Sequence, residues 1–496
     1  MISDQVNYFD DFQKHTKIRC EYLIIGSGAG GSVAALELTA AGKDVLLIEE
    51  GSDYDLKNST DSLSERIALL YRGGGVTPFI GSPIVGFAEG KTLGGTTVIN
   101  GGLIWRTPER ILQQWEKDYN LTGYDKSSLS KHFEKIESLL SVSKMDPLDK
   151  TQNLDSLKLW QGAQSLDWKI VPVPRALNNC TFNNQCPSGC ISGAKKSMKE
   201  TYLPLSIKNG LRIITNARAI KIKKNGRKNI TTIKFSKNQN KCLEVISDHV
   251  VLSGGAIQTP HLINKSGLNK KAGDTLEFHL NLKILAQFDD KINSHKGTMF
   301  TSQIQEFEDD GILIMGSNYR LSYLASTFSH LDNTVISELV EKYNYCGLYV
   351  GQIKADSKGK INSIMVDPLV TWSMCDSDLV TSKVLLEKMC EVLFAAGAIK
   401  LFLPVKNIPP IFDMAELNKY LDAINKSDLE MISVHAMSSC PMGTEIDSIV
   451  DTSGRLNGTN NIIVCDASVL PTNIGESPQG TIMAFSHEII QRNLFL

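Results

Sequence analysis

The sequence predicts a two-lobed α/β protein, in which a parallel-sheet lobe is assembled from discontinuous segments and an inserted lobe is built on an antiparallel sheet plus helices. Three observations predict this fold class. The chain has 496 residues, more than one compact core usually holds. Strand, glycine turn and helix patterns occur near both ends of the chain. Between them, apolar and polar residues alternate, which is typical of strands with one buried face.

Composition excludes several function classes. The 52 Lys and Arg residues balance 54 Asp and Glu residues, so there is no basic character that would favour nucleic acid. The first twenty residues lack the apolar run of a secretory signal, and no stretch approaches the roughly 20 apolar residues of a membrane span. We therefore expect a cytoplasmic protein that acts on a small molecule and binds neither nucleic acid nor a membrane.

The first strand and helix form a βαβ unit. An apolar strand at residues 22–25 leads directly into a GxGxxG pattern formed by Gly26, Gly28 and Gly31, and Glu49 ends the next strand 18 residues later. In such a unit the pyrophosphate of a dinucleotide lies at the helix N-terminus, and the carboxylate can hold a ribose hydroxyl. The pattern predicts a Rossmann-like domain, although by itself it does not separate NAD from FAD.

Later segments extend both lobes. Strand patterns at residues 211–222, 248–255 and 461–468 each run into a small-residue turn, so the dinucleotide-binding segments come from both ends of the chain. Residues 276 to about 430 alternate apolar and polar residues, which predicts an antiparallel sheet.

A helix pattern follows within that inserted stretch. It covers residues 377–397, where Ser377 or Asp378 is expected to cap the N-terminus and Gly397 to stop the helix.

Further stretches separate FAD from NAD. They are GKTLGGTTVINGGLIWRTP (90–108), GAIQTPHLINKSGL (255–268), SVHAMSSCPMG (433–443) and DASVLPTNIGESPQGTIMAFSHEI (466–489). In this order they resemble the glucose-methanol-choline (GMC) oxidoreductases, FAD enzymes that oxidise alcohols. The second stretch follows the family pattern up to Leu268, where Asn269 replaces the usual glycine. The resemblance runs from about Glu21 to the C-terminus and is weakest between 276 and 430.

The resemblance implies FAD contacts along the whole chain. Besides the GxGxxG glycines and Glu49, the expected contacts are Gly94, Gly95, Thr96 and Thr97 along the pyrophosphate and flavin, Asn100 and Gly101 near flavin N5, Ala219 at the adenine, and Asp466 and Ala467 at the phosphate and ribityl chain. A helix that opens near Gly480 or Thr481 would direct its positive end at the flavin N1/O2 locus, where negative charge appears on reduction.

The resemblance also implies the catalytic residues. When an alcohol gives a hydride to flavin N5, its hydroxyl proton must be removed, and a neutral imidazole suits this role. His435 matches the family's histidine base. Most members have a second His or Asn where this chain has Ser477, whose hydroxyl donates one hydrogen bond but is no base near pH 7. Asn473 or Glu476 is an alternative for that missing group.

Cys180, Cys186 and Cys190 form a C-x5-C-x3-C pattern in a Gly/Pro/Asn-rich stretch. It resembles a GMC subgroup that includes dehydrogenases with an iron-sulfur cluster, and this implies a 3Fe-4S cluster held by the three thiolates. A cluster would pass electrons to an acceptor protein or small partner subunit, with which such a chain can also be exported. The alternative is a structural loop whose small cysteines are packed, and both interpretations stay open.

We therefore predict an FAD-dependent alcohol dehydrogenase that passes electrons to an external acceptor. The alternatives are an alcohol oxidase that produces hydrogen peroxide and a non-redox enzyme of the hydroxynitrile-lyase type. The substrate class stays open among sugars, amino sugars and long-chain alcohols. The expected domains are an FAD-binding domain (1–130, 195–275 and 432–496) and a substrate-binding lobe (131–194 and 276–431) that carries the cysteine loop 180–190.

Overall fold

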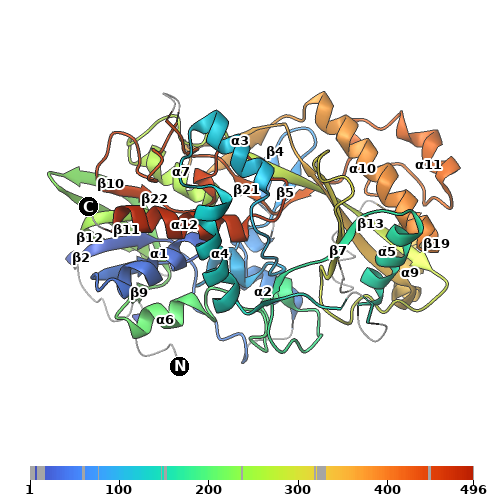
Figure 1. The fold of residues 1–496 in the computed structure, drawn as a ribbon, viewed down its shortest axis with the longest axis horizontal. Coiled ribbons are helices and arrows are strands. Elements are labelled where there is room, and N and C mark those ends of the chain that lie inside the picture. The colour runs from blue at the N-terminus through green and yellow to red at the C-terminus, as the bar shows by residue number, and fades with distance from the viewer. Residues whose placement is uncertain are drawn as a thin grey trace.

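A computed structural model describes residues 6–7, 17–58, 62–75, 77–146, 148–149, 153–235, 238–317, 320, 331–444 and 448–494. Two large sheets lie side by side along the long axis, and the C-terminal helix α12 (Gln479–Asn493) lies in the half that holds the first sheet (Figure 1). Within these residues, no helix combines the length and apolar character that a membrane crossing requires.

The first sheet is Rossmann-like. Its strands run in the order β1 (Val6–Asn7), β9 (Arg212–Ile214), β3 (Val45–Ile48), β2 (Lys17–Ile25), β12 (Asn238–Leu252), β11 (Lys228–Phe235) and β10 (Ala217–Asn225), and β22 (Ile462–Val464) pairs with β12. The strands β9, β3, β2 and β12 pair in parallel, as does β22. The predicted assembly of this lobe from discontinuous segments is confirmed, because its strands come from both ends of the chain.

One predicted strand is wrong. The stretch 211–222 forms two strands, because Asn216 between them adopts a left-handed conformation with φ of 55°. The turn lets the chain leave the parallel β9 and enter the antiparallel meander of β10, β11 and β12.

Helices cover the first sheet. They are α1 (Ala29–Ala40), α4 (Lys126–Leu139), α6 (Tyr202–Lys208), α7 (Gly255–Lys265) and α12 (Gln479–Asn493). The helices α1 and α12 pack against each other, so the GxGxxG segment and the C-terminal segment become neighbours (Figure 1).

The second sheet is mostly antiparallel, as predicted. Its order is β17 (Gly359–Asn362), β18 (Leu369–Trp372), β4 (Thr77–Ile80), β5 (Val85–Phe87), β20 (Ile432–Ser433), β13 (Glu277–Phe288), β16 (Cys346–Lys354), β15 (Ile312–Gly316), β14 (Ser302–Ile304) and β7 (Ile170–Pro172). β19 (Ala398–Phe402) and β21 (Ala436–Met437) pair with β13, while β6 (Val142–Ser143) and β8 (Arg175–Ala176) form a separate ribbon. The strands β4, β5 and β20 join this sheet although they come from segments assigned to the FAD-binding domain.

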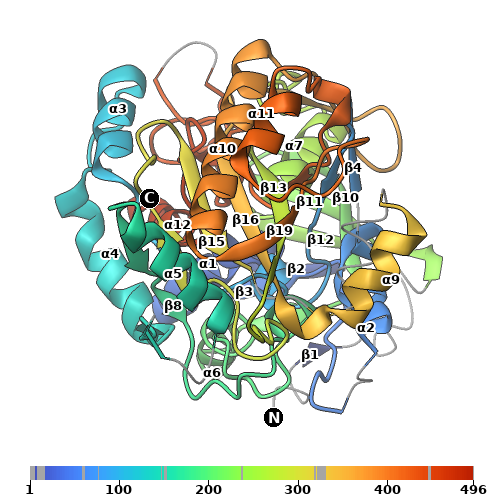
Figure 2. The ribbon, with the colours of Figure 1, turned by 90° about the vertical axis from the view of Figure 1, so that its right-hand side faces the viewer.

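The remaining helices are α2 (Leu63–Leu70), α3 (Glu109–Tyr119), α5 (Leu154–Ser165), α9 (Asn333–Glu341), α10 (Asp376–Ala395) and α11 (Met414–Leu421). The helices α5, α10 and α11 lie toward the viewer in Figure 2, on the outer side of the second sheet. A Cβ on Gly351 in β16 would lie 2.5 Å from Leu385 of α10, so this face of the sheet is closely packed.

The predicted cap of α10 is wrong in detail. Cys375 is the N-cap, and Asp378 lies inside the first turn, where its carboxylate accepts hydrogen bonds from the backbone N–H groups of Asp356 and Ser357. The helix ends before Gly397, whose φ of 87° confirms the predicted stop.

Candidate active site

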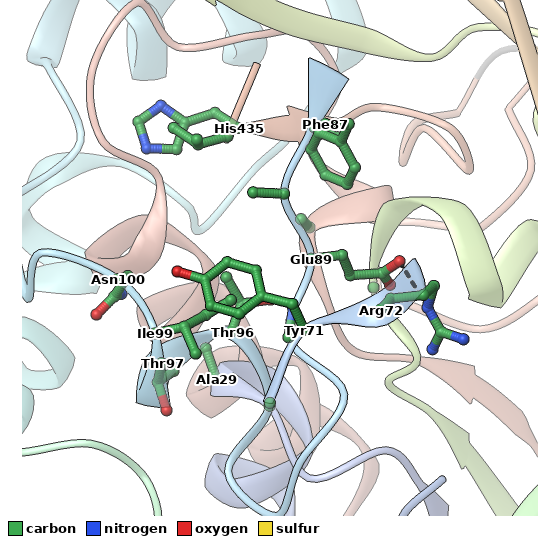
Figure 3. Close-up of a pocket in the computed structure, with 18 of the residues that line it drawn as sticks. Ala29, Tyr71, Arg72, Phe87, Glu89, Thr96, Thr97, Ile99, Asn100 and His435 are labelled. Atoms are coloured by element: carbon green, nitrogen blue, oxygen red, sulfur yellow. Dashed lines mark hydrogen bonds and ion pairs between the residues drawn. The ribbon is translucent and has the colours of Figure 1, made fainter. Parts of the chain in front are cut away.

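One cavity of about 720 Å³ lies between the two sheets and is lined by residues of both. In Figure 3, His435 and Phe87 lie on one side of it, and Thr96, Thr97 and Asn100 lie on the opposite side. The cavity is therefore the place where predicted cofactor residues and the predicted base meet.

The glycine turn before α1 provides one end of the cavity. Gly26 has φ of 101°, and a Cβ there would lie 2.3 Å from the carbonyl oxygen of Ser253. A Cβ on Gly31 would lie 2.0 Å from the carbonyl oxygen of Gly26, so Gly31 lies behind the turn and does not line the cavity. A Cβ on Gly28 would meet nothing within 4 Å, and α1 has no side-chain cap. The N–H groups of α1 are thus open to the cavity, which fits a pyrophosphate.

Charged groups on this side of the cavity are held by the protein. Glu49 lines the cavity, and its carboxylate accepts hydrogen bonds from the Ser27 hydroxyl at 2.6 Å and the Gly51 N–H at 2.8 Å. Burial raises the pKa of Glu49. The Arg72 guanidinium lies 2.9 Å from Glu89 and 3.0 Å from Glu50 (Figure 3 shows the bond to Glu89).

The loop that resembles the family's flavin-contacting segment lies along the cavity. Gly95, Thr96, Thr97, Asn100 and Gly101 line it. The Asn100 amide donates a hydrogen bond to Gln479 Oε1 at 2.5 Å. Because this bond joins the loop to the start of α12, the two segments define one wall.

Gly94 lies one step behind this loop. It does not line the cavity, and its N–H donates to the Ser27 hydroxyl at 2.9 Å. Gly94 therefore holds the loop against the glycine turn.

Two buried cations support the same loop, and sequence reasoning missed both. Arg175 donates two hydrogen bonds to the carbonyl oxygen of Gly101, at 3.0 and 2.6 Å. The Lys195 ammonium donates to the carbonyl oxygens of Val98, Asn100 and Cys186 at 2.7 to 2.8 Å. Burial lowers the pKa of Lys195 to about 8. These contacts fix the backbone of the loop.

The C-terminal segments complete the cofactor side. Asp466 and Ala467 line the cavity, and the Asp466 carboxylate accepts hydrogen bonds from Thr259 and from the N–H of Gly255. Ala219 also lines the cavity. The Asp466 carboxylate is thus fixed against the start of α7.

Helix α12 begins at Gln479 without a side-chain cap, close to the predicted position. Gln479 and Ile482 line the cavity, whereas Gly480 and Thr481 face away from it. The Thr481 hydroxyl lies 2.9 Å from that of Thr107, and a Cβ on Gly480 would lie 2.2 Å from the carbonyl oxygen of Trp105. The helix start therefore faces the cavity through Gln479, which sequence reasoning did not select.

His435 lines the cavity and forms a pair with His279 of β13, which sequence reasoning also missed. The two Nδ1 atoms lie 3.0 Å apart, and the Gly475 N–H donates to His279 Nε2 at 3.1 Å. His279 Nε2 is therefore an acceptor, so the neutral ring carries its proton on Nδ1 and donates it toward His435 Nδ1. The only signal for His279 in the sequence was a histidine within the stretch of alternating apolar and polar residues that begins at residue 276.

The pair determines the resting form of His435. Because His435 Nδ1 accepts a hydrogen bond from His279, the neutral His435 ring keeps its proton on Nε2 and can donate it to a substrate oxygen. Burial lowers the pKa of His435 to about 4, so the ring is neutral near pH 7. To accept a proton at Nε2, His435 must first carry its own ring proton on Nδ1, which requires Nδ1 to release the hydrogen bond from His279.

The candidates for the second catalytic residue differ in whether they line the cavity. Ser477 lines the cavity. Asn473 does not: its amide donates to the carbonyl oxygen of Ala355 at 2.7 Å, so the side chain joins the chain segments behind β13. Glu476 lies outside the cavity too, where it accepts a hydrogen bond from Gln303 and where burial raises its pKa to about 7. The suggestion of Asn473 or Glu476 as an oxygen-holding group is therefore not retained.

The three predicted metal ligands lie behind the cavity wall. None of the ten cysteines forms a disulfide. Each of the three sulfurs accepts a hydrogen bond: Cys180 from the Phe182 N–H, Cys186 from Arg175, and Cys190 from the Lys195 N–H. Although burial would raise it, the cations Arg175 and Lys195 lower the pKa of Cys186.

These three sulfurs do not form a compact site for a single metal ion, because they do not all lie within 4.8 Å of one another. Among the described residues, one set of three His, Cys, Asp or Glu side chains has its possible ligand atoms all within 4.8 Å of one another. The set is Asp356, Cys375 and Asp378. Those three are bonded to neighbouring backbone and serine groups at the start of α10.

Comparisons with known proteins agree with this geometry. Two models of the GMC oxidoreductase family match residues 67–281 and 349–486, and a model of NAD(P)-binding Rossmann-like domains matches residues 24–54. An uncharacterised GMC-type oxidoreductase of Sinorhizobium fredii is 31% identical over 96% of this chain and 95% of its own. A long-chain-alcohol oxidase of Arabidopsis thaliana is 25% identical over 96% of this chain and 68% of its own.

Solved structures share the fold at low identity. Pyridoxine 4-oxidase from Mesorbium loti matches with a TM-score of 0.70 at 16% identity, covering 95% of this chain and 98% of that chain. A formate oxidase of Aspergillus oryzae matches with a TM-score of 0.73 at 13% identity, covering 97% and 98%. The chain belongs to the GMC oxidoreductase family, whose members are FAD-dependent oxidoreductases and include alcohol oxidases.

Proposed function

We propose that this enzyme oxidises an alcohol to an aldehyde or ketone at FAD bound in the cavity. One observation carries the proposal: His435, Ser477 and the loop around Asn100 line a single cavity, while the other end of that cavity is an open glycine turn at the N-terminus of α1. FAD, when bound, accepts a hydride from the carbinol carbon. The residues that would hold it are the cavity-lining cofactor residues described above.

The protein's own residues bind the substrate hydroxyl group and remove its proton. The neutral His435 ring is the proposed base, and the Ser477 hydroxyl is the proposed hydrogen-bond partner of the substrate oxygen. In the resting pair, His435 Nε2–H would first hold that oxygen. Transfer of the His435 ring proton from Nε2 to Nδ1, once Nδ1 is released from His279, would then free Nε2 to take up the hydroxyl proton.

The electron acceptor has two candidates. We propose an external acceptor other than oxygen, with dioxygen as the second candidate. The second is supported by relatives named as long-chain-alcohol oxidase and pyridoxine 4-oxidase. A 3Fe-4S cluster is not part of the proposed electron path, and the iron and sulfide assay below tests for it.

The domain division is part of the proposal. We propose that residues 1–130, 195–275 and 432–496 bind FAD and that residues 131–194 and 276–431 form the substrate lobe. This division is supported by the strands β4, β5 and β20, which come from the proposed FAD-binding segments and pair within the second sheet.

The test is anaerobic reduction of the purified holoenzyme with a panel of primary and secondary alcohols. Bleaching of the flavin absorbance by an alcohol supports alcohol oxidation, and a holoenzyme that no alcohol bleaches contradicts it. Hydrogen peroxide formed at the turnover rate in air identifies dioxygen as the acceptor. Iron and acid-labile sulfide, measured on protein purified without oxygen, test the cluster.

A further inference from the structure

We propose that Lys283 binds a carboxylate of the substrate, so that the enzyme oxidises an alcohol that also carries a carboxylate, a hydroxy acid. This inference rests on the proposed function and names the substrate class of the same site. It comes from the substrate side of the cavity, where Lys283 is the cation of β13.

Lys283 lies on the cavity face of the second sheet. Side chains two residues apart on a strand point to the same face, so His279, Asn281 and Lys283 follow one another along one side of β13. Asn281 and Lys283 line the cavity, and His279 contacts the proposed base. At about 3.3 Å per residue, the Cα of Lys283 lies about 13 Å along the strand from that of His279. An alcohol group and a carboxylate could occupy the two ends of this interval.

The neighbouring strands extend the same wall. In the antiparallel register, Lys283 pairs with Val350, and Val350 pairs with Met315. Val350, Met315 and Leu348 also line the cavity. The ammonium is therefore set in an apolar surface, which suits a ligand with a carbon skeleton and one charged end.

Lys283 differs from every other charged side chain that lines the cavity in the described structure. Each of those forms a hydrogen bond or ion pair with another protein group; they are Glu49, Glu50, Arg72, Glu89, Arg218 and Asp466. For Lys283, no hydrogen bond or ion pair forms with any described residue, and no charged group among them shifts its pKa. Burial alone lowers the pKa of Lys283 to about 8, which leaves the amine mostly protonated at pH 7.

An unpaired ammonium in this position is unfavourable for the empty protein. A partly buried charge without a counter-ion has lost contacts with water and has gained no protein partner in return. A ligand anion would supply that partner. The phosphates of FAD would lie at the glycine turn of the other sheet, at the N-terminus of α1. The substrate is therefore the proposed source of the anion.

The available donors favour a carboxylate over a phosphate. The Asn281 amide already donates to the carbonyl oxygen of Ile432 at 3.3 Å, and the Gln352 amide donates to that of Gly475 at 3.2 Å. The Lys283 ammonium is then the only charged donor of this wall that has no partner among the described residues. A phosphate is usually held by several donors or a helix N-terminus, whereas one ammonium can serve a monoanion.

The first test is binding, measured by the difference spectrum of the flavin in the holoenzyme. The probes are hexanoate and octanoate, with hexanamide and octanamide as uncharged counterparts. We expect each carboxylate to bind at least tenfold more tightly than its amide, and Lys283→Met to abolish this difference. Lys400→Met is the matched control, because Lys400 lies on the neighbouring strand β19, pairs with Glu338 and does not line the cavity.

Three outcomes of the binding test overturn the inference. Equal affinity for carboxylate and amide in the unmodified enzyme is the first. A carboxylate preference that survives Lys283→Met while the variant keeps its FAD is the second. If Lys283→Met instead loses FAD or alters the flavin spectrum without any ligand, Lys283 serves the cofactor and the inference is also wrong.

The second test separates this inference from the proposed function. The holoenzyme is reduced anaerobically with ω-hydroxyhexanoate and with hexanol, and the ratio of the two reduction rates at low substrate is compared between the unmodified enzyme and Lys283→Met. We expect the ratio to fall at least tenfold in the variant. An unchanged ratio contradicts the role of Lys283, whereas the absence of reduction by either alcohol contradicts the proposed function and leaves the binding test to decide on Lys283.

Discussion

The two walls of the cavity use different groups of the protein: one wall presents mainly backbone groups, and the other presents mainly side chains. On the side of the first sheet, backbone groups dominate: a glycine turn, two helix starts without side-chain caps, and charges that are paired within the protein. On the side of the second sheet, side chains that alternate along β13 face the cavity, and one of them, Lys283, has no partner among the described residues. A shared cofactor can be held by the first wall in many enzymes, while the second wall can change its substrate by changing single side chains.

The substrate wall can be disabled while the cofactor wall is kept. We expect His435→Ala to lower the rate of anaerobic flavin reduction by roughly 100-fold to 10,000-fold, because general base catalysis contributes about this much. FAD content should stay equal to that of the unmodified enzyme, since His435 lies apart from the glycine turn. Stopped-flow absorbance gives the rate, and an unchanged rate would contradict the assignment of His435 as the base.

The cofactor wall can be broken in two distinguishable ways. A Cβ on Gly30 would lie 1.8 Å from the backbone oxygen of Cys465, so Gly30→Ala should force α1 away from β22 and cost about 3 kcal/mol of stability. A Cβ on Gly28 meets nothing within 4 Å. Gly28→Ala should therefore leave the stability of the FAD-free protein unchanged and should weaken the binding of FAD. Thermal unfolding without FAD and flavin titration measure the two effects. Equal stability of both variants would show that the turn is not packed as described.

The histidine pair links the base to the second sheet. We expect His279→Phe to slow flavin reduction by about tenfold to a hundredfold, because His435 loses its fixed orientation. His249→Phe is the control, since His249 stacks on Tyr22 outside the cavity. A faster rate in His279→Phe would mean that release of Nδ1 limits the reaction and that the pair holds the enzyme in its resting form.

The smallest expected effect is that of pH. A base must be neutral to act, and burial lowers the pKa of His435 to about 4 from an ordinary value near 6.5. The rate of flavin reduction should therefore change little between pH 8 and about pH 5 and fall only as the solution approaches pH 4. Rates measured after rapid pH jumps test this, and a rate that halves near pH 6.5 would show that His435 titrates as an exposed histidine does.

The cofactor wall could be predicted from the sequence because backbone demands leave a pattern. Only glycine fits where a Cβ would lie against a carbonyl oxygen, as at Gly26 and Gly31. These required glycines therefore appear in the sequence at the fixed spacing of the GxGxxG pattern. The antiparallel sheet was predicted for a similar reason, since alternation marks strands with unlike faces. The turn at Asn216 was missed because apolar residues on both sides hid one left-handed residue.

The substrate wall could not be predicted to the same depth. The sequence shows that residues alternate along 277–288, but not which face borders the cavity or what lies opposite. The proposed roles of His279 and Lys283 become evident only from the position of β13, which lies between β20 and β16 and beside His435. Arg175 and Lys195 were missed for the same reason, because their partners are backbone oxygens distant in sequence.

The most direct test of the central claim, that this cavity brings an alcohol to FAD for hydride transfer, is a deuterium measurement. The holoenzyme is reduced anaerobically with a primary alcohol that bleaches its flavin and with the same alcohol deuterated at the carbinol carbon. We predict that the flavin bleaches with both and that the deuterated alcohol reacts several-fold more slowly, because the carbon–hydrogen bond breaks in the measured step. An enzyme that keeps bound FAD oxidised with every alcohol offered would contradict the account.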